Sequence, residues 1–231
     1  MERRSRVDEK TGAAVHGSQH QIQLYVNNYV DKLSQAVIAT TPSIPQDAQI
    51  EWVSPLRAEG YHEYSDDKFL EALALGAYCA QLAAFWPRRG PNWDALAKFK
   101  SAERSGAILV EAKAHTTEIY GRGCDASPEP RKLIEASLRR TAEWLKVPYE
   151  PSWTGTLYQS ANRLAHLYLL REIAKVDAWL VSIYFLDDRG FISTSQDEWI
   201  PAIAKAKAEL GIAGISVPYS SAVFLRAIED A

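Results

Sequence analysis

The stretch Ala107-Ile108-Leu109-Val110-Glu111-Ala112-Lys113 decides the fold of this chain. An apolar run that contains β-branched residues leads directly into an acid and a base, which predicts a strand over 107–115 with a polar end. Side chains alternate across a strand, so Glu111 and Lys113 share one face. Ala112 turns away from that face and offers its backbone carbonyl at the strand edge.

A second strand, predicted over 92–99, carries Asp94. If the two strands are antiparallel neighbours, Asp94 and Glu111 come together. An ordinary cross-strand ion pair would also explain Glu111 and Lys113, and acid-x-Lys triplets also occur at Asp8/Lys10 and Asp66/Lys68. Only the triplet at 111–113 follows an apolar run and has an aspartate on a plausible partner strand, and this context favours a functional site.

The remaining pattern indicates an α/β protein. Residues 178–186 are apolar on both alternating faces, which predicts a central strand covered on both sides. The order of elements predicts a central mixed β-sheet flanked by helices. The other expected elements are helices over 19–39, 66–86, 156–175 and 200–210, a helix opened by Ser127-Pro128, and strands over 49–53 and 222–228. We expect a polar N-terminal arm and amphipathic helix over 1–45, followed by one α/β domain over 46–231.

Composition limits the classes of function. The chain has 231 residues, 47% of them hydrophobic, and a formal net charge of -3, so it can bury a large core but has no global positive field. Any contact with nucleic acid must therefore come from a local basic face. Cys79 and Cys124 have no metal-ligand spacing and are expected to be reduced thiols. The basic start, residues 1–6, is followed by polar residues, which predicts no signal peptide, no membrane span and a cytoplasmic protein.

Glu71 is a further candidate for the site. It is the only charged residue between Phe69 and Trp86, in a segment that is otherwise apolar or small. A helix that is hydrophobic on nearly every face is normally buried, and a buried carboxyl group is either protonated, paired with a base or near a metal ion. Glu71 could thus be a third carboxylate of the site. The alternative is that it stays hydrated near the helix start, where the helix dipole favours acids.

Together, the helix with Glu71, the segment Pro91-Asn92-Trp93-Asp94 and the segment Ile108–Lys113 resemble the PD-(D/E)XK nuclease superfamily, over roughly residues 65–186. One departure is that Asn92 and Trp93 separate the proline from the aspartate. The resemblance implies a restriction-endonuclease-like core with an N-terminal helical extension. It also implies a metal-dependent phosphodiester hydrolase, a DNA endonuclease, in which Asp94, Glu111 and the carbonyl of Ala112 hold Mg²⁺, or Mn²⁺ in its place, and Lys113 positions the attacking water.

The sequence supports the candidate nucleic-acid contacts less strongly than the metal-site residues. Arg88 and Arg89 immediately precede the strand with Asp94 and could grip backbone phosphates. In related nucleases the corresponding helix places polar residues beside the metal, which makes Gln159 and Arg163 candidates, although an ordinary amphipathic helix predicts the same stripe. His115 shares the face of Lys113, but a histidine at a strand end is more often a hydrogen-bonded surface residue.

Two other classes of function stay open at this point. The nuclease-like fold could be catalytically inactive and bind nucleic acid or a protein partner. Alternatively, the chain could be an unrelated α/β protein in which Asp94 and Glu111 point to opposite sides of the sheet. In each case the amphipathic N-terminal helix needs a partner surface, which a homodimer could provide.

Overall fold

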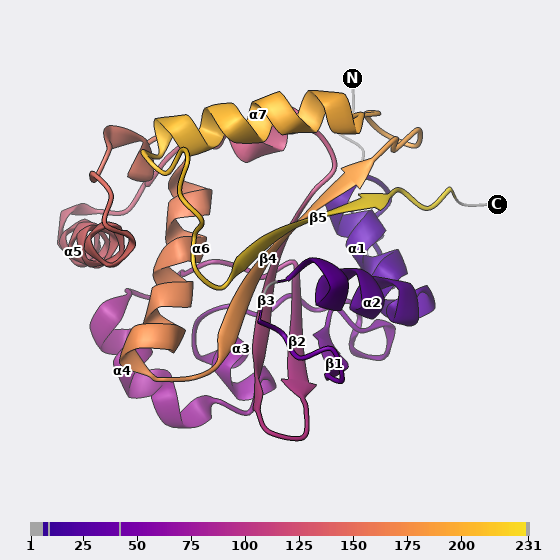
Figure 1. Cartoon of the computed structure of the whole chain (residues 1–231), viewed down its shortest axis with the longest axis horizontal. Helices are drawn as coiled ribbons and strands as arrows, with labels where there is room; N and C mark the ends of the chain where they lie inside the picture. The colour runs from indigo at the N-terminus through magenta and orange to yellow at the C-terminus, as the bar shows by residue number, and fades with distance from the viewer. Residues whose placement is uncertain (1–6, 9, 42, 230–231) are drawn as a thin grey trace.

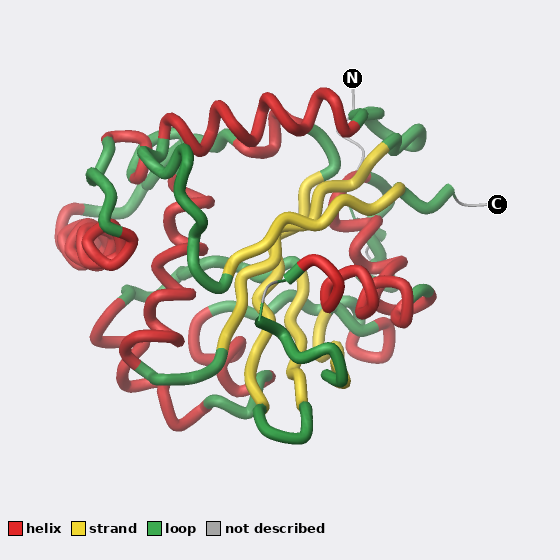
Figure 2. The backbone as a smooth tube through the Cα atoms, viewed as in Figure 1, coloured by secondary structure: helices red, strands yellow, loops and turns green. Residues whose placement is uncertain are grey.

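A five-stranded sheet organises the computed structural model of the chain, which describes residues 7–8, 10–41 and 43–229 (Figures 1 and 2). The strands lie side by side in chain order, from β1 at one edge to β5 at the other. Their bounds are Gln49–Ser54 for β1, Ala95–Lys100 for β2, Ser105–Lys113 for β3, Ala178–Leu186 for β4 and Ser220–Arg226 for β5. The expected α/β class with a central mixed sheet is therefore confirmed.

The directions of the strands change in the middle of the sheet. β1, β2 and β3 form an antiparallel meander, whereas β3, β4 and β5 run parallel. A short turn, closed by a hydrogen bond from Ser101 N to Arg104 O (2.8 Å), joins β2 to β3 and sets their register. The longer connections from β3 to β4 and from β4 to β5 carry helices, as parallel pairing requires.

Helices cover both faces of the sheet. One face packs against α1 (Gly17–Asn28) and α2 (Val30–Thr40), and the other against α3 (Asp66–Ala72), α4 (Cys79–Phe85), α5 (Pro128–Leu145), α6 (Tyr158–Tyr168) and α7 (Gln196–Glu209). In β4, Trp179 is buried against the first layer and Leu180 against the second. This is why the strand is apolar at consecutive positions.

The N-terminal helix expected over 19–39 is two helices. The chain leaves helical geometry at Tyr29 (φ -133°), and α1 and α2 each press apolar side chains onto the sheet. Leu33 and Val37 of α2 are fully buried, which stabilises the fold by roughly 1.5–3 kcal/mol for each side chain. The sheet itself is thus the partner surface that this amphipathic segment requires, and only Tyr29 and Val30 remain as large exposed hydrophobic side chains in it.

The segment before α1 is more structured than expected. Val7 and Ala14 form an isolated β-bridge, and the Ala14 amide donates to the Gln23 side chain (2.8 Å). The basic start at 1–6 lies outside the described residues. None of the helices in the described ranges combines the length and the hydropathy needed to cross a lipid bilayer.

The prediction of a single helix over 66–86 is wrong, because α3 ends at Ala72 and α4 begins at Cys79. Ala74 adopts a left-handed conformation (φ 60°), and the Leu75 amide closes the end of α3 by donating to Leu70 O (2.7 Å). The break lets Leu70 and Leu82, on different short helices, both enter the core. Helix propensity gives no sign of it, because every residue near the break except Gly76 tolerates a helix.

The remaining elements begin and end close to the expected positions. The Ser127-Pro128 start of α5 is confirmed. α6 is shorter than expected and continues into a single π-helical turn over Leu169–Ile173. α7 starts earlier than expected, at Gln196, because the Ser195 and Glu198 side chains form a capping box there.

Candidate metal-binding site at the end of strands β2 and β3

Asp94 and Glu111 meet where β2 begins and β3 ends. Ala95 and Val110 are the last residue pair of the antiparallel β2–β3 register, and Asp94 directly precedes Ala95 while Glu111 directly follows Val110. Residues opposite each other in an antiparallel pair project to the same face. The face that carries Glu111 also carries Leu96, Leu109 and Leu180, and it is the face covered by α6. The charge of Glu111 raises the pKa of Asp94, so the two acids lie near enough to interact.

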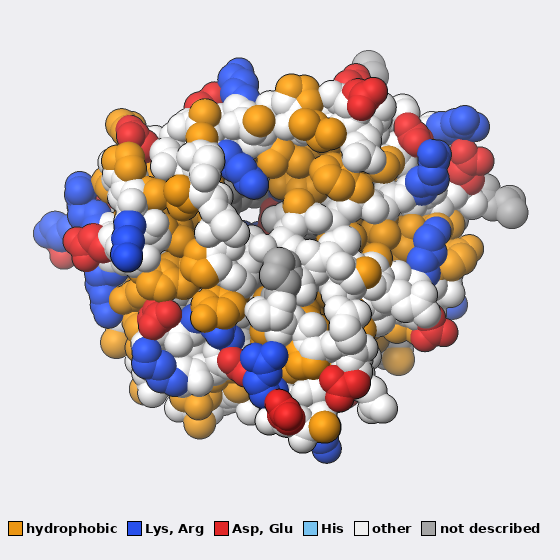
Figure 3. All heavy atoms as spheres, in the orientation of Figure 1, with side chains coloured by type: hydrophobic (Ala, Val, Ile, Leu, Met, Phe, Trp, Pro, Cys, Tyr) orange, Lys and Arg blue, Asp and Glu red, His pale blue; other side chains and the backbone are white. Residues whose placement is uncertain are grey.

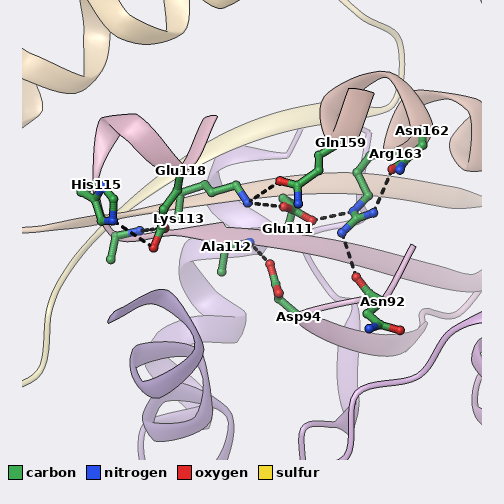
Figure 4. A network of polar contacts seen from close by, with 11 residues as sticks. Asn92, Asp94, Glu111, Ala112, Lys113, His115, Glu118, Gln159, Asn162 and Arg163 are labelled. Carbon is green, nitrogen blue, oxygen red and sulfur yellow. Dashed lines mark hydrogen bonds and ion pairs between the residues drawn. The ribbon is translucent and has the colours of Figure 1, made fainter. Parts of the chain in front are cut away.

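The Asp94 carboxylate is held by the backbone of β3. Its Oδ2 accepts a hydrogen bond from the Ala112 amide (2.6 Å), just beyond the last paired residue of β2 (Figure 4). A strand residue directs its N–H and its C=O to the same neighbouring strand, so the Ala112 carbonyl also points to the side of Asp94. Burial raises the pKa of Asp94 to about 8, and the charge of Glu111 adds to the shift, while Lys113 and Arg163 oppose it.

Glu111 is the centre of an ion-pair network. Lys113 Nζ lies 2.5 Å from its Oε1, and Arg163 Nε lies 2.5 Å from its Oε2. Burial opposes ionisation of Glu111, but the charges of Arg163 and Lys113 outweigh it and lower the pKa of Glu111. The charges of Glu111 and Asp94 likewise overcome burial and raise the pKa of Lys113. Both ions of the Glu111–Lys113 pair are therefore charged at neutral pH.

The Arg163 side chain is largely buried beneath α6. It is 8% exposed, and besides Glu111 it donates to Asn162 Oδ1 and to the carbonyl of Asn92 (both 2.8 Å). Its guanidinium also lies 4.9 Å from the centre of the Trp93 ring. It thus ties α6 to β3 and to the segment that carries Asp94, a role that the sequence analysis did not foresee.

The other two candidates near β3 have different surroundings. Gln159 is exposed and accepts a long hydrogen bond from Lys113 Nζ (3.4 Å), so it lies beside the site. His115 turns to its own loop, where it pairs with Glu118 (3.3 Å) and hydrogen-bonds Thr117 (2.6 Å). This matches the alternative in which His115 is an ordinary hydrogen-bonded residue at the strand end.

Glu71, Arg88 and Arg89 are not part of this network. The Glu71 side chain is 50% exposed and pairs with Lys68 (2.6 Å), so the premise that it is buried without a base does not hold. Arg88 and Arg89 lie in the surface loop after α4, where the Arg88 side chain is 88% exposed and only 4.0 Å from Asp67 at the nearest atoms. The structure leaves both arginines accessible to a ligand but shows no contact between them and Asp94.

Glu63 is a third acid near the site that sequence reasoning missed. Burial raises its pKa, and the charge of Glu111 raises it further, while a hydrogen bond from Gln19 Nε2 (3.0 Å) lowers it. The charge of Glu63 in turn raises the pKa of Asp94. The residue sits in an irregular loop before α3, where no periodicity marks it, and only the tertiary structure brings it toward β3.

The oxygen donors of the site form a partial coordination shell, which suits Mg²⁺, and not a complete set of protein ligands. Among the described residues, no group of three or more His, Cys, Asp or Glu side chains is arranged to hold a metal ion. Two carboxylates, Asp94 and Glu111, and the Ala112 carbonyl form a partial shell of hard oxygen atoms. Mg²⁺ keeps several waters and often binds through one or two carboxylates together with substrate phosphates, so a partial shell fits it.

A cavity of about 210 Å³ adjoins this network on the same face of the sheet. It lies between β3, β4 and β5, α6, α7 and the loop that follows α7. Glu111, Lys113 and Arg163 form one of its sides.

No family model matches the chain, and the comparisons with curated proteins and with solved structures give no match either. The resemblance to PD-(D/E)XK nucleases therefore stays a prediction that rests on the motif residues and on their geometry.

Proposed function

We propose that this chain is a metal-dependent phosphodiester hydrolase of the PD-(D/E)XK type. Its proposed substrate is nucleic acid, with DNA as the first candidate. One observation supports the proposal: Asp94, directly before β2, accepts a hydrogen bond from the Ala112 amide, which lies between Glu111 and Lys113 on β3. The mixed sheet with helices on both faces is also what a restriction-endonuclease-like core requires.

The chemistry follows from the residues of the site. Asp94, Glu111 and the Ala112 carbonyl would hold Mg²⁺, which when bound polarises the scissile phosphate and stabilises the attacking and leaving oxygens. Lys113 keeps its proton at neutral pH because its pKa is raised. It therefore donates hydrogen bonds to the attacking water and to a phosphate oxygen rather than accepting a proton. Arg163 fixes Glu111 from behind, so that the carboxylate does not need to reorganise during the reaction.

A second candidate is a non-catalytic module with the same fold that binds nucleic acid or a protein partner. The observation in its favour is that Lys113 and Arg163 already engage both oxygens of Glu111. A cation at Glu111 must share that carboxylate with these two side chains. Binding of Mn²⁺ measured by calorimetry separates the two candidates, because only the hydrolase requires binding that depends on Asp94.

The test of the hydrolase is a cleavage assay on single-stranded, double-stranded and branched DNA and on RNA, with and without Mg²⁺ or Mn²⁺. We expect Asp94→Asn and Lys113→Met to lose about 100-fold or more in rate, the scale of removing one group that stabilises a transition state. Lys98→Met is the matched control, because Lys98 also lies on a strand and pairs with a glutamate, Glu51 (3.0 Å), but away from the site. Equal cleavage by all three variants and the unmodified chain would show that the assignment is wrong.

A further inference from the structure

The cavity beside Glu111 and Lys113 has apolar walls and a polar floor. Its aliphatic lining comes mainly from Ile119, Leu164, Leu180, Ile203, Ala206 and Ile212. Ser160, Ser182, Ser220 and Tyr184 also line the cavity, from α6, β4 and β5, and the side chains of Ser182 and Tyr184 hydrogen-bond each other. In the space-filling view, a hollow opens below α7 among hydrophobic side chains (Figure 3).

The size of this cavity limits its occupant. Its volume of about 210 Å³ lies below the ~300–1,000 Å³ of pockets that hold drug-sized ligands. It also exceeds several times the ~30 Å³ that one water molecule occupies in the liquid. The cavity therefore has room for a single ring-sized group and not for a base pair.

The lining matches the chemistry of a nucleobase. A base has apolar faces that pack on aliphatic or aromatic side chains and an edge of donors and acceptors that needs polar partners. Serine and tyrosine hydroxyls can both donate and accept hydrogen bonds, so they can pair with such an edge. The side chains of Lys113, Arg163 and Lys207 bring three positive charges to the cavity against the single negative charge of Glu111, which favours a group attached to phosphates.

The acid and the base of the site are deeply placed. The side chains of Glu111 and Lys113 are 11% and 16% exposed, and α6 covers the sheet beside them. A phosphate inside a rigid double helix can reach such recessed groups only if its nucleotide leaves the stack. A phosphate in an unpaired, extended strand can approach them directly and insert the neighbouring base into the cavity.

We propose that this cavity receives one unpaired base next to the scissile phosphate, so that the substrate is single-stranded or locally unpaired nucleic acid. The proposal rests on the function proposed above and names its substrate class. The phosphate lies over Glu111 and Lys113, and the base lies beyond them toward β4 and β5, beneath α7.

The test compares three substrates in Mg²⁺: a mixed-sequence single-stranded oligodeoxynucleotide, its duplex, and a strand of equal length that lacks bases. We expect the single strand to be cut about tenfold faster, or more, than either of the others, because a duplex must first give up pairing and stacking. Ala206→Leu fills the cavity from α7 and should slow cleavage of the single strand about tenfold, to the rate of the base-free strand. Ala208→Leu is the matched control, because Ala208 is exposed on the same helix.

Ala222→Leu fills the cavity from β5 and replaces Ala206→Leu if that variant does not show cooperative unfolding. Equal cleavage of all three substrates, unchanged by the filling variants but lost in Asp94→Asn, would overturn the base-binding cavity and leave the hydrolase intact. Absence of metal-dependent cleavage of every substrate would instead overturn the hydrolase itself.

Discussion

Arg163 on α6 reaches Glu111 on β3 with its Nε 2.5 Å from Oε2, and this pair joins the second helical layer to the sheet. Both side chains are buried, so water does not compete for the hydrogen bond between them. Its removal affects stability and the site together, because Glu111 would then rely on Lys113 alone.

Arg163→Met is expected to destabilise the fold by less than the ~3–5 kcal/mol of an uncompensated buried charge, because Lys113 still pairs with Glu111. The variant also loses the hydrogen bonds to Asn92 and Asn162. Urea denaturation measures the effect. The control is Arg131→Met, which breaks a partly exposed ion pair with Glu135 and a hydrogen bond to Cys124 O (3.2 Å) and should cost much less. Similar losses in the two variants would contradict a structural role for the buried pair.

Asp94 should make the stability of the metal-free protein depend on pH. Its pKa is raised from 3.8 to about 8, so the folded chain holds the proton more tightly than the unfolded chain. The stabilisation that this proton provides is complete below the unfolded pKa and is lost as pH rises through the folded pKa. Asp94→Asn should therefore show a flatter stability profile than the unmodified chain between about pH 4 and pH 8.

The same shift predicts how the metal binds. Mg²⁺ and Mn²⁺ need the ionised carboxylate, so binding below the pKa of Asp94 must release a proton. We expect the affinity for Mn²⁺, measured by isothermal titration calorimetry in buffers of different ionisation enthalpy, to rise with pH and to level off above about 8. Affinity that does not change over this range would mean that Asp94 is not a ligand.

His166 should make the folded protein less stable as the pH falls, whereas Asp94 makes it less stable as the pH rises. Burial lowers its pKa from 6.5 to about 4, although its hydrogen bond to the Asn162 carbonyl (2.8 Å) opposes the shift. The folded chain thus binds this proton more weakly, and the stability that the neutral ring provides is lost as pH falls through the folded pKa. His166→Gln should lose less stability than the unmodified chain between about pH 7 and pH 4, as thermal unfolding can measure. His62→Gln, on the surface, is the matched control.

Three fully buried tryptophans should respond differently to replacement by phenylalanine. Trp153 donates to Leu210 O (2.9 Å) and Trp199 to Phe185 O (3.0 Å), whereas no acceptor in the described part of the chain pairs with Trp93 Nε1. Trp153→Phe and Trp199→Phe each leave a carbonyl without its donor, so they should cost about 1–3 kcal/mol more than Trp93→Phe. Equal losses in guanidinium unfolding would show that the indole N–H of Trp93 has a partner in solution.

The sequence predicted those parts of the fold that local pattern determines. The apolar runs located β3 and β4, and alternation along β3 placed Glu111 and Lys113 on one face. The pairing of Asp94 with Glu111 was only a conditional prediction, because it depends on the length of the turn at 101–104. Local pattern also failed at Ala74, where the core requires a break that no residue type demands.

The site was harder to predict than the fold, because its supporting residues come from distant segments. Arg163 belonged to a polar stripe that an exposed helix would also show, yet α6 is buried on most of its sides. Glu63 lies in a loop with no periodicity, and its influence on Asp94 arises only through packing. Glu71 had the stronger local argument but is exposed, because the helix that was expected to bury it is interrupted.

The first 45 residues also determine where this protein can be divided. Ile22, Tyr25 and Leu33 contact the same apolar layer as Val110 and Trp179, so the proposed boundary at residue 46 runs through a shared interior. A recombinant fragment that starts there would present a bare aliphatic surface to the solvent and should aggregate on expression. Supplying residues 1–45 as a separate polypeptide in the same cell should restore its solubility.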